Sequence, residues 1–365
     1  MYMIAFVKIS LKDGISKKIL AQAAALSKKV GACTLLCLNE DSCFQKIVFN
    51  KDKMQVPQIG DKIVINFASF GRVDPFIRKV DAELDGINDP LYIRHMVPSI
   101  KYVSFLRKYK RNKIIYEIPT YPYYYEQITA STNKILTIAR LVQESLFWPL
   151  IYNQVKKIVA IPCRSTAKKY RKMQYITNGY SSNGTFSRYE RDKDEIVLIG
   201  VGTIQKYHGY DKIIEMIHVT SSRNIRFIIV GGGEVDPLKK LVEKYNLQEQ
   251  VVFTGPKGGE ELEALYRQAD IGVGTMALEL RKADIDTGIK ILDYYIHGLP
   301  VLSSGKCPDV DGLDNPPYRI IDDYTNATPI YQINKCFDEA SREKLSRNSA
   351  SLYSWDSIME RAING

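Results

Sequence analysis

The stretch DIDTGIKILDYYIHGLPVL, residues 284–302, decides how the chain folds. An acidic segment leads through Gly288 into a short apolar helix, and Gly-Leu-Pro at 298–300 ends that helix before a strand. Glycine favours a helix end, and proline cannot continue the helix. Gly288, Lys290 and Asp293 nevertheless occupy the front of a helix that is apolar enough to be buried. Two interpretations follow: a core helix with a Lys290–Asp293 ion pair on its surface, or a site for a charged ligand at the helix N-terminus.

Strand-like and helix-like segments alternate along the rest of the chain. Apolar, β-branched segments predict strands at 1–10, 62–67, 112–118, 156–162, 194–202, 225–233, 250–255, 269–275 and 300–305. The segments 236–246 and 260–269 have the spacing of amphipathic helices. This rhythm predicts an α/β chain with two doubly wound, Rossmann-like parallel domains. Polar, turn-rich residues 174–195 predict the linker, and two such domains that face each other enclose a central cleft.

The charge of the chain is divided unevenly. Residues 1–172 hold 29 Lys and Arg against 13 Asp and Glu, and residues 173–365 hold 22 against 28, so the two parts carry +16 and −6 of the net +10. The runs RKYKRNK (107–113) and KKYRK (168–172) lie in the basic part. Either run alone is typical of a solvated face, but together they indicate an anionic partner, either membrane phospholipid or nucleic acid. The two-domain α/β pattern and the lack of an aromatic stacking ladder favour the membrane.

Composition limits the class of protein further. The 365 residues suffice for two domains, and 45% hydrophobic and 25% charged residues are ordinary for a globular protein. No apolar run reaches the roughly 18 residues of a membrane-spanning helix, and the N-terminus lacks the plan of a signal peptide. The six cysteines are scattered, and Cys33 and Cys37 are expected in a core strand. We therefore expect a protein of a reducing cytoplasm, on the inner face of the membrane.

Four segments of the second half occur in a recognisable order: VGTIQKYHGYDKIIEMI (201–217), FIIVGGGEVDPLKKLVEKYNLQEQVVFTG (227–255), ELEALYRQADIGVGTMAL (261–278) and KILDYYIHGLPVL (290–302). Their order and spacing resemble retaining glycosyltransferases of family 4, which have the GT-B fold. EIPTYPYYYE (117–126) and LYIRH (91–95) are similar to a bacterial subgroup that assembles capsular polysaccharide, exopolysaccharide or O-antigen. The resemblance implies an acceptor-binding domain at 1–178, a linker at 179–194, a nucleotide-sugar-binding domain at 195–345, and a C-terminal helix at 346–365 that packs back on the first domain.

The resemblance implies a nucleoside diphosphate sugar as donor, with a UDP-sugar favoured. Asp293 stands where the family has its second acid, which holds the ribose, whereas Ile285 replaces the first acid, which contacts the donor sugar. Lys290 and Arg281 are basic residues that the subgroup keeps in this region. For His208, a role in its own turn and a contact with phosphate are both open. The donor-binding residues expected by resemblance are Gly14, Thr203, His208, Lys212, Gly232, Gly255, Pro256, Lys257, Asp286, Thr287, Gly288 and Ile289.

Fewer candidate residues lie in the first half. Glu117 is expected to end a strand and open a Pro-Thr-Tyr-Pro loop, with Arg94 as its polar partner around an acceptor hydroxyl. His95 is similar to the family's early-domain histidine, which contacts the sugar. The acceptor-binding candidates of this loop are Tyr121, Tyr123 and Glu126. Its aromatic residues could stack on a sugar ring, meet a membrane interface or only stiffen the loop.

The function predicted from this resemblance is transfer of a hexose, with retention, to a lipid-linked glycan at the cytoplasmic membrane. Its catalytic residues would be Lys290, Arg281, Asp293, Glu117, Arg94 and His95, and we expect neither a metal nor a cofactor. Two alternatives remain. A catalytically silent GT-B protein that binds a nucleotide or glycan is favoured by Ile285, and a nucleic-acid binder is favoured by charge alone.

Overall fold

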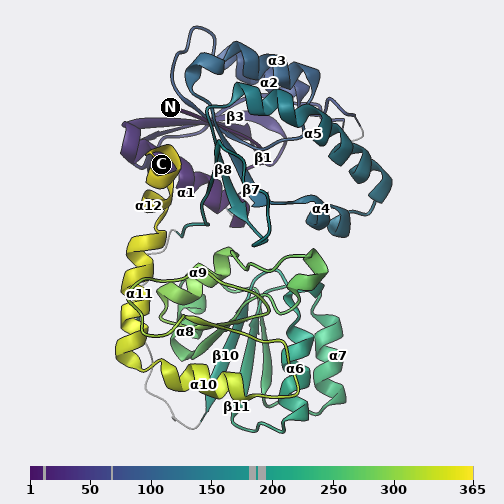
Figure 1. Cartoon of the computed structure of the whole chain (residues 1–365), viewed down its shortest axis with the longest axis vertical. Helices are drawn as coiled ribbons and strands as arrows, with labels where there is room; N and C mark the ends of the chain where they lie inside the picture. The colour runs from purple at the N-terminus through teal and green to yellow at the C-terminus, as the bar shows by residue number, and fades with distance from the viewer. Residues whose placement is uncertain (11–13, 67–68, 181–185, 188–194, 365) are drawn as a thin grey trace. The chain divides into compact units, whose positions relative to one another are not determined.

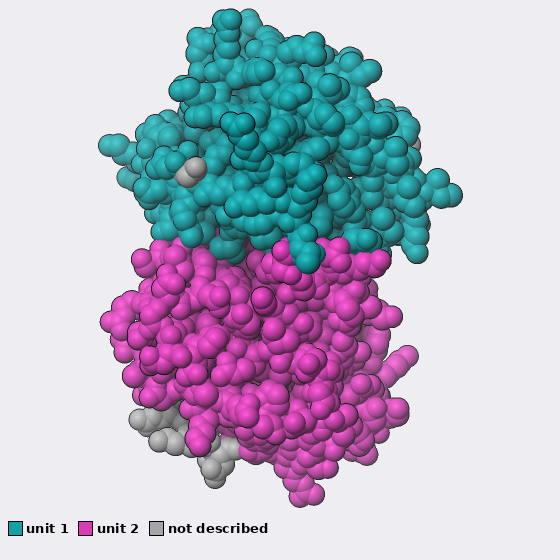
Figure 2. Space-filling model, viewed as in Figure 1, with its two compact units in different colours: residues 1–162, 166–177, 355–365 teal, residues 163–165, 178–354 magenta. Residues whose placement is uncertain are grey.

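The computed structural model describes residues 1–10, 14–66, 69–180, 186–187 and 195–364. These residues divide into two compact units, shown in Figure 2. Unit 1 consists of residues 1–162, 166–177 and 355–365, and unit 2 of residues 163–165 and 178–354. Residues 181–185 and 188–194 of the predicted linker lie outside the described part of the chain.

Unit 1 is built on a mixed sheet with the strand order β4-β3-β2-β1-β6-β7-β8-β9, in which β5 also pairs with β3. From β2 to β9 the neighbours are parallel, whereas β3 is antiparallel to β2. The loop 39–42 between β2 and β3 is too short for a crossover, so these strands form a hairpin. The strands are β1 Tyr2–Lys8, β2 Ala32–Leu38, β3 Cys43–Asn50, β4 Lys53–Met54, β5 Gln58–Lys62, β6 Leu91–Arg94, β7 Ile115–Tyr121, β8 Lys157–Pro162 and β9 Met173–Tyr175.

The helices of unit 1 form two groups. α1 packs on β2 and β3 and on α12, while α3 packs on both α2 and α5 (Figure 1). The side chain of Ser99 caps α3 by accepting from the amide of Tyr102, and Asn133 caps α5 in the same way. The helices are α1 Gly14–Val30, α2 Asp74–Glu83, α3 Ile100–Lys108, α4 Tyr124–Ala130, α5 Lys134–Gln154 and α12 Trp355–Asn364, with the 3₁₀ turn η1 at Lys110–Asn112.

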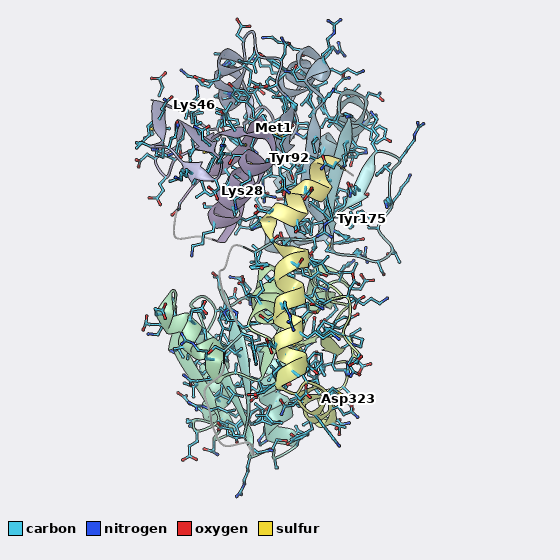
Figure 3. The ribbon with its side chains drawn as sticks, turned by 90° about the vertical axis from the view of Figure 1, so that its left-hand side faces the viewer. Met1, Lys28, Lys46, Tyr92, Tyr175 and Asp323 are labelled. Atoms are coloured by element: carbon cyan, nitrogen blue, oxygen red, sulfur yellow. The ribbon has the colours of Figure 1, made fainter. Side chains whose placement is uncertain are left out.

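The C-terminal helix α12 returns to unit 1, as the family resemblance implies. Its Asp356 and Glu360 form ion pairs of 3.1 and 2.6 Å with Lys28 and Lys29 of α1 (Figure 3, Lys28 labelled). The side chains of Ile358, Met359 and Ala362 on its inner face are buried. The preceding helix, α11 at Glu339–Tyr353, belongs to unit 2.

Unit 2 is built on a fully parallel sheet with the strand order β12-β11-β10-β13-β14-β15. The order reverses between β10 and β13, and ligands of doubly wound sheets bind at such a point, beyond the carboxyl ends of the strands. The strands are β10 Ile196–Val201, β11 Ile225–Val230, β12 Val251–Gly255, β13 Ile271–Val273, β14 Val301–Ser303 and β15 Tyr318–Ile320. The helices are α6 Tyr210–Val219, α7 Asp236–Lys244, α8 Glu260–Gln268, α9 Ile289–Ile296, α10 Thr328–Cys336 and α11, with 3₁₀ turns η2 Lys206–His208 and η3 Leu278–Arg281.

Both units are doubly wound α/β layers, so the predicted fold class is confirmed. Gly298 ends α9 with a φ of +69°, as the sequence predicts. Gly231 has a φ of +138°, and a Cβ there would lie 1.8 Å from the carbonyl oxygen of Gly202. The loops after β10 and β11 therefore lie backbone against backbone, which explains the glycines after β11 without a dinucleotide site.

Two predictions of local structure are wrong. Of the strand predicted at 62–67, Lys62 is the last residue of β5, residues 63–66 form no strand, and Phe67 lies outside the described residues. Ile63 is buried and Val64 is 82% exposed, so the alternation that suggested a strand is present, but its pairing with the β3 side ends at the hydrogen bond from the amide of Ile63 to the carbonyl of Ser42. Glu117 does not end a strand, since β7 continues to Tyr121.

Candidate functional site

The candidate site of unit 2 lies beyond the carboxyl ends of β10 and β13, where the strand order reverses. Three segments meet there. They are the residues that follow β10 through η2, those that follow β13 through η3, and the acidic segment that leads into α9. The first turn of α9 brings backbone amides and the positive end of the helix dipole to this place.

Lys290 lies in the first turn of α9 and is half-buried. Its Nζ donates to the carbonyl oxygen of Gly274 at 2.9 Å and lies 3.5 Å from the hydroxyl of Tyr210. Lys290 thus points toward the strand ends, as the interpretation of a ligand site requires, and not along the helix surface, as the alternative ion pair with Asp293 would require. Burial lowers the pKa of Lys290 to about 8, with Asp286 opposing the shift and the nearby Arg281 adding to it.

Asp286 fastens the segment before α9 to the sheet. Its buried carboxylate accepts from the amide of Thr275 at 2.6 Å, the hydroxyl of Ser303 at 3.2 Å and the amide of Gly288 at 3.3 Å. Charge-assisted hydrogen bonds of this kind are stronger than neutral ones. Asp286 therefore sets the position of Gly288 and, through it, of the first turn of α9.

His208 closes the turn η2. Its Nδ1 accepts from the amide of Gln205 at 3.2 Å, so the ring proton of the neutral imidazole is on Nε2. Burial, together with the charges of Lys290 and Arg281, lowers the pKa of His208 to about 2. The turn role that the sequence left open is therefore present. The imidazole is uncharged and stands within the field of two cations.

Arg281 is the third member of this group, and its guanidinium carbon lies 4.9 Å from the ring centroid of Tyr207. Stacking on an aromatic face holds a guanidinium in place while leaving it charged. Lys290, Arg281 and His208 come from three different elements. The ring of His208 lies 5.4 Å from that of Tyr210, and Nζ of Lys290 lies 5.3 Å from the centroid of the same Tyr210 ring. The ring of His208 also lies 4.7 Å from that of Tyr207, on which Arg281 stacks. We call Lys290, Arg281 and His208 the cationic group.

The other predicted donor residues have varied surroundings. Lys212 is held at 2.7 Å by Glu279 and at 2.9 Å by the carbonyl of Met276, and Lys257 is held at 2.5 Å by Glu261. Thr203 is exposed. Positions in loops or at the ends of elements are Gly232, Gly255, Pro256, Thr287 and Ile289. Gly14 is the first residue of α1, and residues 11–13 of the loop before it lie outside the described chain.

Asp293 is half-buried in the middle of α9, and its charge adds to the burial that raises the pKa of Tyr266. Ile285, in place of the family's first acid, is half-buried, and its amide donates to the carbonyl of Cys163 at 3.2 Å. Asp284 beside it accepts from the amide of Ser165 at 2.7 Å.

A buried charged cluster lies in unit 1 around Glu117. The carboxylate of Glu117 is fully buried and lies 3.1 Å from a guanidinium nitrogen of Arg94 and 3.5 Å from Nζ of Lys18. Gln22 donates to it at 3.3 Å. Burial opposes ionisation, but the two cations lower the pKa of Glu117, so it is a carboxylate. The predicted Glu117–Arg94 pair exists, whereas Lys18 and Gln22 were missed.

His95 belongs to a second buried cluster of unit 1. Its Nδ1 lies 2.9 Å from the hydroxyl of Tyr116, and its Nε2 lies 3.4 Å from a carboxylate oxygen of Glu144. Tyr123 donates its hydroxyl to the same carboxylate. Burial and the charge of Glu144 raise the pKa of Tyr123, which keeps the hydroxyl protonated. Glu144 has no local sequence signal, because it lies in a helix that the sequence did not predict.

An aromatic pocket adjoins this second cluster. It includes the predicted Tyr121 and Tyr123 and adds residues from α5 and from the loop before β9. Glu126 is half-buried in the first turn of α4 and is not one of the lining residues. The cavity has a volume of about 20 Å³, room for about one water molecule, so a polar ring such as a sugar would stack at its mouth and not enter it. We call it the aromatic pocket, and its lining is Ile118, Tyr121, Tyr123, Tyr124, Glu144, Ser145, Trp148 and Tyr170.

Comparison with known proteins bears on unit 2 most directly. Residues 183–309 match the family model described as glycosyl transferases group 1. The matched residues contain all three members of the cationic group.

In the part of the chain that the structure describes, no helix is long and apolar enough to cross a membrane.

Two curated relatives match part of this chain, and one of them is called a glycosyltransferase. An uncharacterized glycosyltransferase of Methanocaldococcus jannaschii is 27% identical over 187 residues, which cover 47% of this chain and 44% of that protein. An uncharacterized 41.2 kDa protein in the cps region of Klebsiella pneumoniae is 28% identical over 128 residues, 34% of this chain and 33% of that protein. The match thus spans less than half the length of either relative.

Solved structures show the fold. The Anabaena protein HepE in complex with UDP and glucose superposes with a TM-score of 0.61 at 11% sequence identity, covering 99% of this chain and 98% of that one. At this identity the likeness concerns the fold alone, and it is the two-domain GT-B architecture that the sequence predicted.

Proposed function

We propose that this chain, whose residues 183–309 carry the glycosyl transferases group 1 sequence, is a retaining hexosyltransferase. It transfers a hexose from a nucleoside diphosphate sugar, with UDP favoured, to a hydroxyl of a lipid-linked glycan in bacterial surface polysaccharide synthesis. The observation that carries the proposal is the cationic group at the carboxyl ends of β10 and β13. Two positive charges and a neutral imidazole gather there beside the start of α9.

The chemistry of the donor needs this kind of site. When the bond between the sugar C1 and the diphosphate oxygen breaks, negative charge grows on the departing diphosphate. Lys290 and Arg281 would stabilise that charge, together with the first amides of α9 and the Nε2 proton of His208. The acceptor oxygen forms the new bond to C1 on the same face, and its proton passes to the departing phosphate. The sugar is transferred with its anomeric configuration retained.

The remaining residues of unit 2 would shape the rest of the donor site. Asp293 would hold the ribose, as the family's second acid does, and Asp286 fixes the approach to α9 through Gly288. Backbone groups near Thr203 and Gly232 and at 255–257 would frame the nucleotide. UDP is favoured because the structurally similar HepE was solved with UDP and glucose.

The acceptor is assigned from unit 1. The aromatic pocket offers ring faces on which a sugar would stack, and the buried Glu144 would act behind them by holding His95 and Tyr123. His95 contacts Glu144 and Tyr116, and it would orient the reacting sugars through this network. Arg94 and Glu117 would hold Lys18, and with it the helix α1, in position through the buried ion pairs of Glu117. A polysaccharide acceptor is supported by the relative from the cps region of Klebsiella pneumoniae.

One observation favours a second candidate function. Ile285 occupies the position of the family's first acid and contributes no charge to the donor sugar. A catalytically silent protein that binds a nucleotide or glycan would retain the cationic group and lose this acid. The two functions differ in turnover and agree in nucleotide binding.

Calorimetric titration with UDP, GDP and ADP tests the donor site. We expect one nucleotide to bind, and Lys290→Ala and Asp293→Ala to weaken it by about tenfold or more, since each removes a charged partner. Lys335→Ala is the matched control, because this exposed lysine lies in the last turn of α10, away from the segments that form the donor site. Binding of no nucleotide by the folded protein would refute the donor site.

Hydrolysis of the matching nucleotide sugar then separates the two functions. Slow release of the free sugar would support the transferase function. NMR of the sugar at the moment of release shows its anomeric configuration and therefore whether the configuration is retained. A protein that binds the nucleotide but releases no sugar from a panel of donors, with or without a lipid-linked acceptor, is the silent binder.

A further inference from the structure

The solvent-facing side of α5 is aliphatic. Its exposed apolar side chains recur every three or four residues and therefore lie on one face of the helix. Most surface helices place apolar residues inward, so an aliphatic outer face marks a surface that is covered in the working protein. The residues, with their exposed fractions, are Ile135 (82%), Ile138 (49%), Val142 (53%), Leu146 (71%) and Leu150 (43%). We call them the α5 stripe.

The charged residues of α5 do not interrupt the stripe. Between Lys134 and Gln154 the charged residues are Lys134 at the first position, Arg140 and Glu144. Glu144 is 4% exposed and Arg140 is half-buried, so both point toward the body of unit 1. The helix thus has apolar residues on two sides: Leu141 and Ile151 are buried on the inner side, and the solvent side carries aliphatic residues where charges are usual.

The apolar surface extends beyond α5. Gln143, next to the stripe, donates to the carbonyl oxygens of Phe70 and Pro98. These contacts hold the segments around Phe70 and Ile100 against the helix, and the side chains of Phe70 and Ile100 are 52% and 76% exposed. Figure 1 shows α5 lying along the outside of unit 1, next to α3.

Aromatic and basic residues border the stripe on the C-terminal half of α5. The ring of Tyr170 lies 5.7 Å from Trp148 and 5.9 Å from Tyr152, so the segment 168–172 packs on the helix. Lys172 donates from the same segment to the carbonyl oxygen of Tyr152 at 2.8 Å. The lysines at 168 and 169 and the arginine at 171 are exposed. One of the two basic runs of the sequence therefore lies beside the aliphatic surface.

We propose that the α5 stripe docks on an anionic lipid bilayer, with the stripe in the acyl boundary and the 168–172 run against the headgroups. An aliphatic face bordered by Trp, Tyr and Lys/Arg is the arrangement of a helix that lies in a membrane interface. The charge argues for this occupant, since a second copy of the chain would bring an equally basic run against this one. Trp148 belongs both to this border and to the aromatic pocket, which places the pocket next to the bilayer. Membrane docking adds a partner to the proposed function. It rests on that function in one respect only, namely that the acceptor is linked to a lipid.

Vesicle flotation tests the surface directly. The full chain is mixed with vesicles of phosphatidylcholine alone or with added phosphatidylglycerol, and the floated fraction is measured. We expect binding to the anionic vesicles, and a decrease of about tenfold or more for Ile138→Gln/Leu146→Gln, because two side chains lose their burial in lipid. The matched control is Val219→Gln/Ile320→Gln, two exposed apolar residues of unit 2 that are 58% and 46% exposed. It should bind as the wild type does.

Three results would overturn the proposal. They are wild-type protein that floats with neither vesicle, Ile138→Gln/Leu146→Gln protein that floats as well as wild type, and a lipid-free dimer by light scattering that the same substitutions dissociate. The last result assigns the stripe to a second copy of the chain. Titration of the same variants with UDP reads the donor site separately, so failure of membrane docking is distinguishable from failure of the proposed transferase.

Discussion

Lys290 should make nucleoside diphosphate binding weaken as the pH rises above neutrality. Its ammonium is half-buried at the start of α9, and burial lowers its pKa to about 8. A diphosphate is attracted by the ammonium and not by the neutral amine. The bound anion therefore raises the pKa of Lys290, and linkage requires the affinity to fall once the free protein loses this proton.

The size of the effect follows from the fraction of protein that carries the charge. With a pKa of about 8, Lys290 is charged in about nine of ten molecules near pH 7 and in about one of ten near pH 9. If binding requires the ammonium, the dissociation constant increases about tenfold across this interval. His208, with its pKa lowered to about 2, stays neutral throughout and contributes nothing to the change.

Calorimetry with UDP at several pH values between about 7 and 9 measures this slope. Lys290→Arg is the control, because the guanidinium stays charged over the whole range. Its affinity should be nearly independent of pH, and any loss that it shares with the wild type belongs to the nucleotide base or to another group. Equal slopes in wild type and Lys290→Arg would refute a role for the Lys290 ammonium in holding the diphosphate.

Two further predictions concern stability, and urea unfolding measures both. Gly231→Ala should lower the free energy of unfolding by about 2 kcal/mol or more, because the φ of Gly231 is positive and a Cβ there would meet a carbonyl oxygen. The control Gly232→Ala should be nearly neutral, since the nearest atom to its Cβ would lie at 3.5 Å. Equal effects of the two substitutions would contradict the backbone contact. Glu117→Gln should lower the free energy of unfolding by about 3 to 5 kcal/mol, because it leaves two buried cations without their counter-charge. The control Glu40→Gln, at an exposed position, should unfold within about 0.5 kcal/mol of the wild type. A small effect of Glu117→Gln would show that the cluster contributes little to stability.

Sequence periodicity predicted unit 2 well because its strands are short apolar runs between amphipathic helices. Each run from β10 to β14 was located, with ends that differ by a few residues. In unit 1 the same signal misled at 63–66, where Ile63 and Val64 alternate in burial without forming a strand. The helix α5 escaped prediction for the opposite reason, because its apolar residues lie on two faces, one buried and one exposed.

The candidate site was predicted where its residues are close in sequence and missed where they are not. Lys290 and the Asp286 segment could be located at the front of α9 from one stretch of chain. Gln22 and Glu117 are 95 residues apart, and their contact depends on how α1 packs over the sheet. Nothing local in the sequence marks Lys18 or Glu144 as the partner of a distant charge. These side chains could be identified only after the fold had brought their elements together.

The position of Lys290 costs stability, and this cost can be measured. Its folded-state pKa of about 8 lies below the ordinary 10.5, so the unfolded chain holds the extra proton between these values and the stability of the wild type should rise with pH through that window. Lys290→Met removes the buried charge and keeps most of the side-chain volume. It should raise the free energy of unfolding near pH 7 by about 1 to 2 kcal/mol, after allowing for the lost hydrogen bond to Gly274. It should also reduce the rise of stability with pH, whereas the share of Lys18, whose pKa burial likewise lowers to about 8, should remain. If the variant is instead less stable than wild type, Lys290 serves the fold. If it is more stable and no longer binds UDP, the chain gives up stability to keep an ammonium where only an anionic ligand compensates for its burial, as substrate sites commonly do.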